Sequence, residues 1–349
     1  MLWAVLLVSG MPVSPAAGQQ LGREMRREGD AVRFEIAFRD TRSRRHELRF
    51  DLSAASYRAA KSGLTAPDSP EVERRIERAV GAYVEKRRAA WRDRMRKRLN
   101  RLERDLPRHI DLQHGFGDDG LSWQLESREA SRAELQQIAG RMSDNIERLS
   151  RKLVNAYQAK VERHAQQVRD RIYENLSYIR DPNLGVLRVD YRRVARRAAP
   201  RLEPVARALA KRAGGGTRER LSLALAFLQT IPYDRLTDRN AANGTGFATP
   251  VEMLHLNRGD CDSKATALAA LMRRLAPEIR IAMVMLPGHA VLAADVPARP
   301  GDLTIRLRGE RFVLTEPAGP ALAPVGRIGD DSRRSIEANN VTGIVWMNG

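Results

Sequence analysis

The sequence predicts an α+β protein in which a small β element and a long antiparallel helical hairpin precede a second, mixed domain. Two segments, about residues 69–106 and 131–179, have the helical spacing of apolar residues that predicts the hairpin. Short apolar alternations before these helices, between them and near the C-terminus predict strands. Helices and strands that gather in separate runs are typical of the α+β class.

Composition and charge restrict the classes of partner. The chain has 349 residues, 42% of them hydrophobic, and a formal net charge of +18, most of it carried before residue 201. Such a charge attracts nucleic acid, anionic lipid or an acidic envelope polymer, although an arginine-rich composition without a binding role explains it equally well. We find no zinc-ligand spacing, phosphate loop or aromatic-rich basic strand, so we expect no metal, no cofactor and no specific nucleic-acid partner.

The first 20 residues have the shape of a secretory signal peptide. An apolar run from Leu2 to Val8 is followed by Pro15 and three small residues, although no Lys or Arg precedes the run. A buried N-terminal segment is the alternative interpretation. With a leader, the protein would be periplasmic or secreted. No later run approaches the roughly 18 apolar residues that cross a bilayer, so we expect no transmembrane span in the mature protein.

Residues 21–182 are expected to form a strand pair and the basic helical arm. Apolar residues alternate over 32–38 and over 48–52, which predicts two half-buried strands. Alternation on both sides of Gly117–Gly120 predicts a β-hairpin between the long helices. An eleven-residue step along the second helix predicts a nearly straight coiled-coil pairing. Its members are Leu135, Ile146, Tyr157, Val168 and Ile179. Such an arm is too narrow for a deep pocket, so we expect it to offer a surface for a protein partner or an anionic surface.

Residues 183–349 are expected to form the second domain, which holds the only cysteine of the chain, Cys261. Thr249-Pro250 with Glu252 predicts a helix start, and Asp260 predicts the cap of the next helix, with Cys261 at its first position. A helix N-terminus favours negative charge and therefore a thiolate. The alternative is a small buried cysteine with a structural role.

A base and an acid follow the cysteine along the chain. "IRIAMVML" and "HAVLAADV" predict two strands, with His289 at the start of the second. A further hairpin about Gly309 delivers Glu316 at the end of its last strand. The order of helix-start thiol, strand-start imidazole and strand-end carboxylate indicates nucleophilic catalysis. Other candidates for the partner roles are Asp262, Asp295 and His255.

Four segments between about residues 215 and 325 together resemble the transglutaminase-like superfamily: "FLQTIPYD", "ATPVEMLHLNRGDCDSKA", "PGHAVL" and "FVLTEP". The bacterial transglutaminase-like cysteine peptidases, several of them periplasmic, are the most similar in "ATPVE" and "GDC". The resemblance implies a papain-like core, with Cys261 as nucleophile, His289 as general base and later acid, and Glu316 as the carboxylate that orients the ring. Aspartate is usual in the family where this chain has Glu316, and the helical arm has no counterpart in the family core.

The implied chemistry is acyl transfer through a thioester. The backbone N–H of Cys261 would stabilise the oxyanion, with Gln229 or Tyr233 as the second donor. We therefore predict a cysteine-dependent hydrolase or acyltransferase, a peptidase or amidase, that acts on a protein or peptide of the cell envelope. The alternative is a non-catalytic scaffold or adaptor in which the arm is the working surface.

Overall fold

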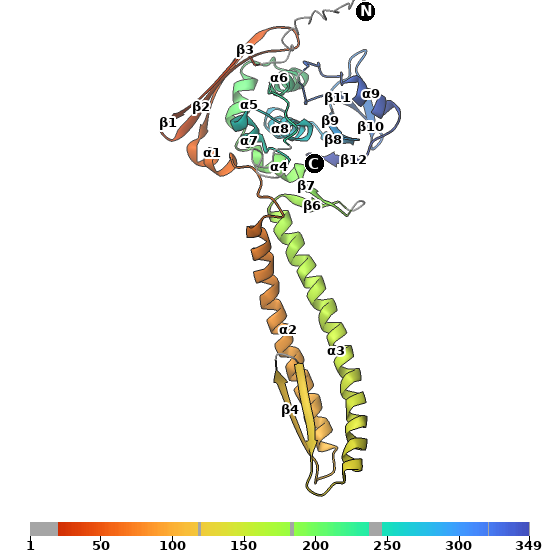
Figure 1. Cartoon of the computed structure of the whole chain (residues 1–349). Helices are drawn as coiled ribbons and strands as arrows, with labels where there is room; N and C mark the ends of the chain where they lie inside the picture. The colour runs from red at the N-terminus through yellow and green to blue at the C-terminus, as the bar shows by residue number, and fades with distance from the viewer. Residues whose placement is uncertain (1–19, 118–119, 182–184, 237–245, 320, 349) are drawn as a thin grey trace, which may run out of the picture. The chain divides into compact units, whose positions relative to one another are not determined.

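The structure is a computed structural model that describes residues 20–117, 120–181, 185–236, 246–319 and 321–348. It contains two compact units (Figure 1). Residues 67–175 form one unit, and the described residues up to Ala66 together with those from Leu176 onward form the other. Both units combine helices with antiparallel strands, so the α+β class is confirmed. The expected leader lies outside the described residues, apart from Gln20.

The first unit is the helical arm. Helices α2 (Pro70–Arg104) and α3 (Arg132–Asn175) contact each other, and strands β4 (Asp111–Gly117) and β5 (Gly120–Glu126), which lie between them in the chain, form the predicted hairpin. An apolar cluster joins the hairpin to both helices: Met95, Leu99, Ile110, Leu112, Ile138, Met142 and Ile146. In the part of the chain that the structure describes, no helix is both long enough and apolar enough to cross a membrane.

The second long helix ends earlier than its apolar pattern predicts. Helix α3 stops at Asn175, and Ser177 has a left-handed backbone with a φ of 69°. A left-handed residue cannot continue a right-handed helix, so the chain turns there. Strand β6 (Tyr178–Arg180) follows, where Ile179 is 43% exposed. The prediction that Ile179 continues the eleven-residue stripe is therefore wrong.

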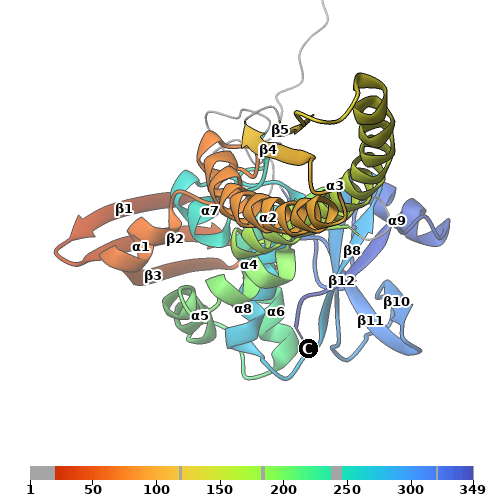
Figure 2. The same cartoon turned by 90° about the horizontal axis from the view of Figure 1, so that it is seen from below.

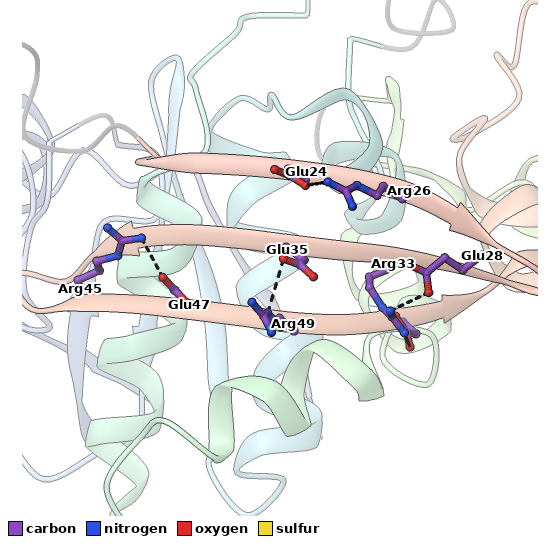
Figure 3. Close-up of polar contacts among 9 residues, drawn as sticks. Glu24, Arg26, Glu28, Arg33, Glu35, Arg45, Glu47 and Arg49 are labelled. Carbon is purple, nitrogen blue, oxygen red and sulfur yellow. Dashed lines mark hydrogen bonds and ion pairs between the residues drawn. The ribbon is translucent and has the colours of Figure 1, made fainter.

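A three-stranded sheet begins the second unit. Strands β1 (Gly22–Glu28), β2 (Ala31–Arg39) and β3 (Arg45–Ser53) pair antiparallel in that order. The alternation that predicted β2 and β3 divides their side chains between a buried apolar face and a charged face, on which arginines pair with glutamates (Figure 3). Strand β1 was not predicted, because its sequence GREMRRE shows no apolar alternation.

This sheet belongs with the second domain, which corrects the predicted boundaries of 21–182 and 183–349. Its apolar face packs on helices α5 (Glu203–Ala210) and α6 (Thr217–Gln229). The rings of Phe38 and Phe227 lie 5.6 Å apart across this contact. A half-apolar sheet must bury one face, and the surface that buries it is encoded more than 150 residues later. The predicted boundary near residue 182 falls inside the hairpin of β6 and β7 (Leu187–Val189).

The core of this unit is a five-stranded antiparallel sheet with a helix packed against it (Figure 2). The strand order is β10-β11-β9-β8-β12, and helix α8 contacts β9 as well as helices α4, α5, α6 and α7. The remaining bounds are α1 (Ala54–Ala60), α4 (Tyr191–Ala198), α7 (Pro250–Leu256), α8 (Cys261–Leu275), β8 (Ile281–Leu286), β9 (His289–Ala294), β10 (Thr304–Leu307), β11 (Glu310–Thr315), α9 (Asp330–Glu337) and β12 (Gly343–Trp346). The start of α8 and the adjoining ends of β9 and β11 carry the candidate site.

Candidate active site

Cys261 is the first residue of α8, as the sequence predicts. The preceding residue, Asp260, caps the helix by accepting a hydrogen bond from the Ser263 N–H at 3.1 Å. Just before the cap, Gly259 packs so closely that a Cβ there would lie 2.9 Å from the sulfur of Met253. The cysteine side chain is partly exposed and is a free thiol. The positive end of the helix dipole therefore lies beside a sulfur that solvent reaches.

His289 begins β9, and Glu316 directly follows β11, its antiparallel neighbour. Gly288, with a φ of +68°, makes the turn from β8 that places the ring at the strand start. The Nε2 atom of His289 lies 2.9 Å from Oε1 of Glu316. The other carboxylate oxygen accepts a hydrogen bond from the hydroxyl of Ser332 on α9 at 3.2 Å. Both oxygens of Glu316 are therefore held, and so is the plane of the imidazole.

The imidazole of His289 joins the carboxylate to the sulfur. A hydrogen bond with the Cys261 thiol, followed by the hydrogen bond to Glu316, raises the pKa of His289 to about 10, although burial opposes the shift. Because Nε2 faces Glu316, Nδ1 is the ring nitrogen left for the sulfur. An imidazolium at neutral pH favours a thiolate beside it. The structure thus brings Cys261, His289 and Glu316 together in the order required of a nucleophile, a base and an orienting acid.

Gln229 lies near these residues but does not serve the predicted oxyanion role. Its side chain is fully buried, and its amide Nε2 donates to the carbonyls of Glu316 at 2.7 Å and Ala323 at 3.0 Å. An amide nitrogen has two hydrogens, so neither is left for an oxyanion. Gln229 instead positions the segment that carries Glu316. The backbone that follows Glu316 also approaches Gln229 closely, since a Cβ on Gly319 would lie 2.3 Å from the Gln229 carbonyl oxygen.

Tyr233 fits the second donor role better than Gln229 does. Its backbone pairs in parallel with Gly259, two residues before Cys261. The side chain is 41% exposed, and its pKa is raised by burial and then by the negative charge that Cys261 develops. Its O–H therefore keeps its proton at neutral pH. A protonated phenol is able to donate to an oxyanion.

Lys264 is a buried cation that the sequence analysis did not assign to the site. Its ammonium group, fully shielded from solvent, donates to the backbone carbonyls of Ile231 at 2.5 Å and of Ala318. Desolvation lowers the pKa of Lys264 to about 7, against the attraction of Asp260 and Glu316. The lysine ties the segment before Tyr233 to the segment after Glu316. A lysine on the apolar face of α8, three residues after the cysteine, is the signal that could have found it.

A carboxyl pair adjoins the thiol on the other side. The hydroxyl of Tyr191 on α4 donates to Asp262 at 2.7 Å, and Asp260 hydrogen-bonds to Asp262. Burial, followed by the neighbouring charge of Asp262, raises the pKa of Asp260 to about 8. A carboxyl that retains its proton places less negative charge beside a thiolate than an ionised one would.

The other candidates from the sequence have different partners. The carboxylate of Asp295 pairs with Arg280, at 2.6 Å, and His255 hydrogen-bonds to the hydroxyl of Tyr57. Within the described residues, no group of three or more His, Cys, Asp or Glu side chains is placed to hold a metal ion.

A cavity of about 660 Å³ adjoins the imidazole and the carboxylate. His289, Glu316 and the start of α9 line it, and the acidic side chains of Asp330 and Asp331 stand at its border. Its volume lies within the ~300–1,000 Å³ usual for ligand clefts. A substrate could therefore reach the ring from this side.

Comparisons with known proteins add no relative to this description. No protein-family model matches the chain, no curated protein matches it significantly, and neither does any solved structure.

Proposed function

We propose that the chain is a cysteine-dependent hydrolase or acyltransferase of the transglutaminase-like type, with a papain-like core in its second unit. The observation that carries the proposal is the contact of His289 with both Cys261 and Glu316. The contact joins a thiol at a helix start with an imidazole at a strand start and a carboxylate after a strand end. The packing of these elements does not require such a contact. The sequence resemblance around "GDC" and "PGHAVL" supports the same assignment.

The proposed reaction begins with the Cys261 thiolate and the His289 imidazolium. The sulfur attacks the carbonyl carbon of an amide, and a C–S bond forms as the carbonyl oxygen takes the negative charge. The backbone N–H of Cys261 and the hydroxyl of Tyr233 stabilise that oxygen. The imidazolium then gives its proton to the leaving amine as the C–N bond breaks, which leaves a thioester and a neutral ring.

Water or a second amine completes the cycle. The neutral His289 takes a proton from the incoming nucleophile as it attacks the thioester carbonyl. The C–S bond breaks, the product leaves as an acid or a new amide, and the thiolate–imidazolium pair returns. Glu316 stabilises the charged ring in both halves of the reaction and remains ionised. We place this activity on a protein or peptide substrate in the periplasm or outside the cell, in accord with the leader expected from the sequence.

Alkylation of the sole cysteine tests the proposal directly, because any label on the protein reports Cys261. We expect iodoacetamide to modify the folded protein at pH 6 at least about tenfold faster than it modifies a free thiol such as N-acetylcysteine. His289→Ala should abolish that advantage. Asp295→Asn is the matched control, because Asp295 lies in the same unit but pairs with Arg280. A rate no faster than the free thiol would instead favour the non-catalytic scaffold.

Turnover needs a second assay. Envelope proteins incubated with the enzyme and a biotinylated primary amine should yield cleaved fragments, biotin conjugates or both, and Cys261→Ala should yield neither. Conjugates indicate acyl transfer to amines, and fragments without conjugates indicate hydrolysis. Products that persist with the Cys261→Ala variant would overturn the catalytic assignment.

A further inference from the structure

The helical arm contains a hollow of about 280 Å³ between α2, α3 and the β4–β5 hairpin. We call it the arm hollow and define it by Arg88, Trp91, Arg92, Phe116, Val154 and Tyr157. Three aromatic rings and an aliphatic side chain form its walls, and two guanidinium groups stand at its rim. The volume is below the usual range for a cofactor cleft, ~300–1,000 Å³, but suits a single inserted side chain.

Trp91, which lines the arm hollow, has an unsatisfied hydrogen-bond donor. The indole Nε1 of Trp91 is buried and has no hydrogen-bond partner among the described residues. The indole ring is held edge to face against Phe116, with 5.8 Å between centroids. A buried N–H without an acceptor costs about 1–3 kcal/mol. Solvent does not reach this nitrogen, so a ligand in the arm hollow would contact the Trp91 side chain and not its N–H.

Helix α2 is strongly basic beside the arm hollow. Residues 86–104 of α2 contain ten Lys or Arg and only two Asp or Glu. Among the described residues, only Arg88 and Lys97 of this segment form ion pairs with carboxylates, and both pairs are within the helix. Arg92, at the rim, has no ion pair there. Exposed cations without partners favour a ligand that carries carboxylates.

The observations favour a peptide over a membrane surface. A membrane-binding helix needs a stripe of exposed apolar side chains, and the exposed large hydrophobic residues of the described chain all lie outside residues 67–175. Arginines and aromatic residues line the arm hollow. Trp, Tyr and Arg are the residue types that most often anchor protein partners.

We propose that the arm hollow binds an acidic segment of a partner protein. One apolar or aromatic side chain of that segment enters between Trp91, Phe116 and Tyr157, and flanking carboxylates pair with Arg88 and Arg92. This recognition is independent of the proposed chemistry at Cys261. It gives the arm the function of a docking element, and it holds whether the other unit is an enzyme or a scaffold.

The test uses the full-length protein and fluorescein-labelled peptides at ~150 mM salt, where long-range attraction is screened. One peptide has a phenylalanine flanked on each side by glutamates, and the other has a glycine in its place. We expect fluorescence anisotropy to give about tenfold tighter binding for the phenylalanine peptide. Arg88→Gln with Arg92→Gln should weaken that binding about tenfold. Trp91→Ala removes one aromatic wall of the arm hollow and should weaken it several-fold.

The matched control is Arg74→Gln with Arg75→Gln, which removes the same charge from the same helix away from the arm hollow. This variant should bind the phenylalanine peptide as the wild type does, and circular dichroism should show equal helix content in all variants. Equal affinity for both peptides, or an equal loss in the control variant, would reduce the effect to general charge and overturn the proposal. Tighter binding to phosphatidylglycerol vesicles or to oligothymidine than to the peptide would also overturn it, in favour of a membrane or a nucleic acid.

Discussion

The imidazole of His289 lies 2.9 Å from the carboxylate of Glu316, although 27 residues separate them in the chain. Antiparallel pairing of β9 with β11 creates this proximity, because the start of one strand adjoins the end of the other.

Glu316 should act mainly through its charge. Glu316→Gln keeps an acceptor for His289 and a partner for Ser332, but it removes the negative charge that raises the pKa of the ring. We expect a fall of at least about tenfold in the alkylation rate of Cys261 at pH 6. Ser332→Ala retains the charge and should cost less than threefold. Equal effects of the two substitutions would assign Glu316 a packing role only.

The pH dependence should follow the pKa of His289, which rises from 6.5 to about 10 on folding. The folded state then holds a proton that the unfolded state loses above pH 6.5. The contribution of the ring to stability is therefore complete below pH 6.5 and is lost as the pH rises to about 10. The difference in Tm between the wild type and His289→Gln should shrink across that range. A difference that stays constant from pH 6 to 10 would contradict the raised pKa.

Substitutions of Gln229 and Tyr233 should have different effects. We expect Gln229 to matter for stability and Tyr233 to matter for turnover. Gln229→Met leaves the buried carbonyls of Glu316 and Ala323 without donors, so we expect a loss of ~2–4 kcal/mol in the free energy of unfolding. Tyr233→Phe removes only a partly exposed hydroxyl and should leave the Tm unchanged while lowering kcat. Denaturant unfolding and turnover of the same variants distinguish the two. Tyr233→Phe with full activity would exclude its hydroxyl as an oxyanion donor.

Asp260→Asn should stabilise the protein at alkaline pH. The folded carboxyl has a pKa of about 8, so between about pH 4 and 8 it holds a proton that the unfolded state has lost, and stability falls as the pH rises. Asparagine caps a helix as well as aspartate does and donates to Asp262 without ionising. We expect no change in Tm at pH 4 and a gain of at least about 1 kcal/mol at pH 8.

Asp190→Asn is the control for this gain. Asp190 caps α4 by the same kind of hydrogen bond, to the Arg193 N–H at 2.9 Å, and it lies outside the carboxyl pair. It should show no gain that grows with pH. A similar gain in both variants would point to net charge as the cause.

The arm should unfold without disturbing the thiol. Leu99 is fully buried in the cluster of the arm, and Leu99→Ala should cost ~3–5 kcal/mol of arm stability. Because residues 67–175 form their own compact unit, the reactivity of Cys261 should be unchanged at temperatures where the arm has lost its helical signal. Loss of both together would show that the two units unfold as one.

Local patterns were sufficient for the elements that position Cys261. The Thr249 capping box, the Asp260 cap and the place of Cys261 at the first position of α8 were all predicted from neighbouring residues and confirmed. Capping depends on hydrogen bonds that span three or four residues, so a short stretch of sequence contains the whole interaction. The strand start at His289 was predicted for the same reason, from the Pro287-Gly288 turn.

Contacts between distant segments could not be predicted in this way. The sequence analysis offered Gln229 as an oxyanion donor, and the structure directs its amide to carbonyls 87 and 94 residues away. It left Lys264 unassigned, because a buried lysine is recognised only when the carbonyls that satisfy it are known.

By itself, the sequence determined the α+β class, the helical arm with its hairpin, and the places of Cys261 at a helix start and His289 at a strand start, because periodicity, caps and turns act over a few residues. The tertiary structure decided that the N-terminal sheet belongs with the second unit, that Gln229 positions and does not donate to an oxyanion, and that Trp91 retains an unpartnered N–H. Each of these depends on which surfaces meet, and one sequence does not record that pairing along its length.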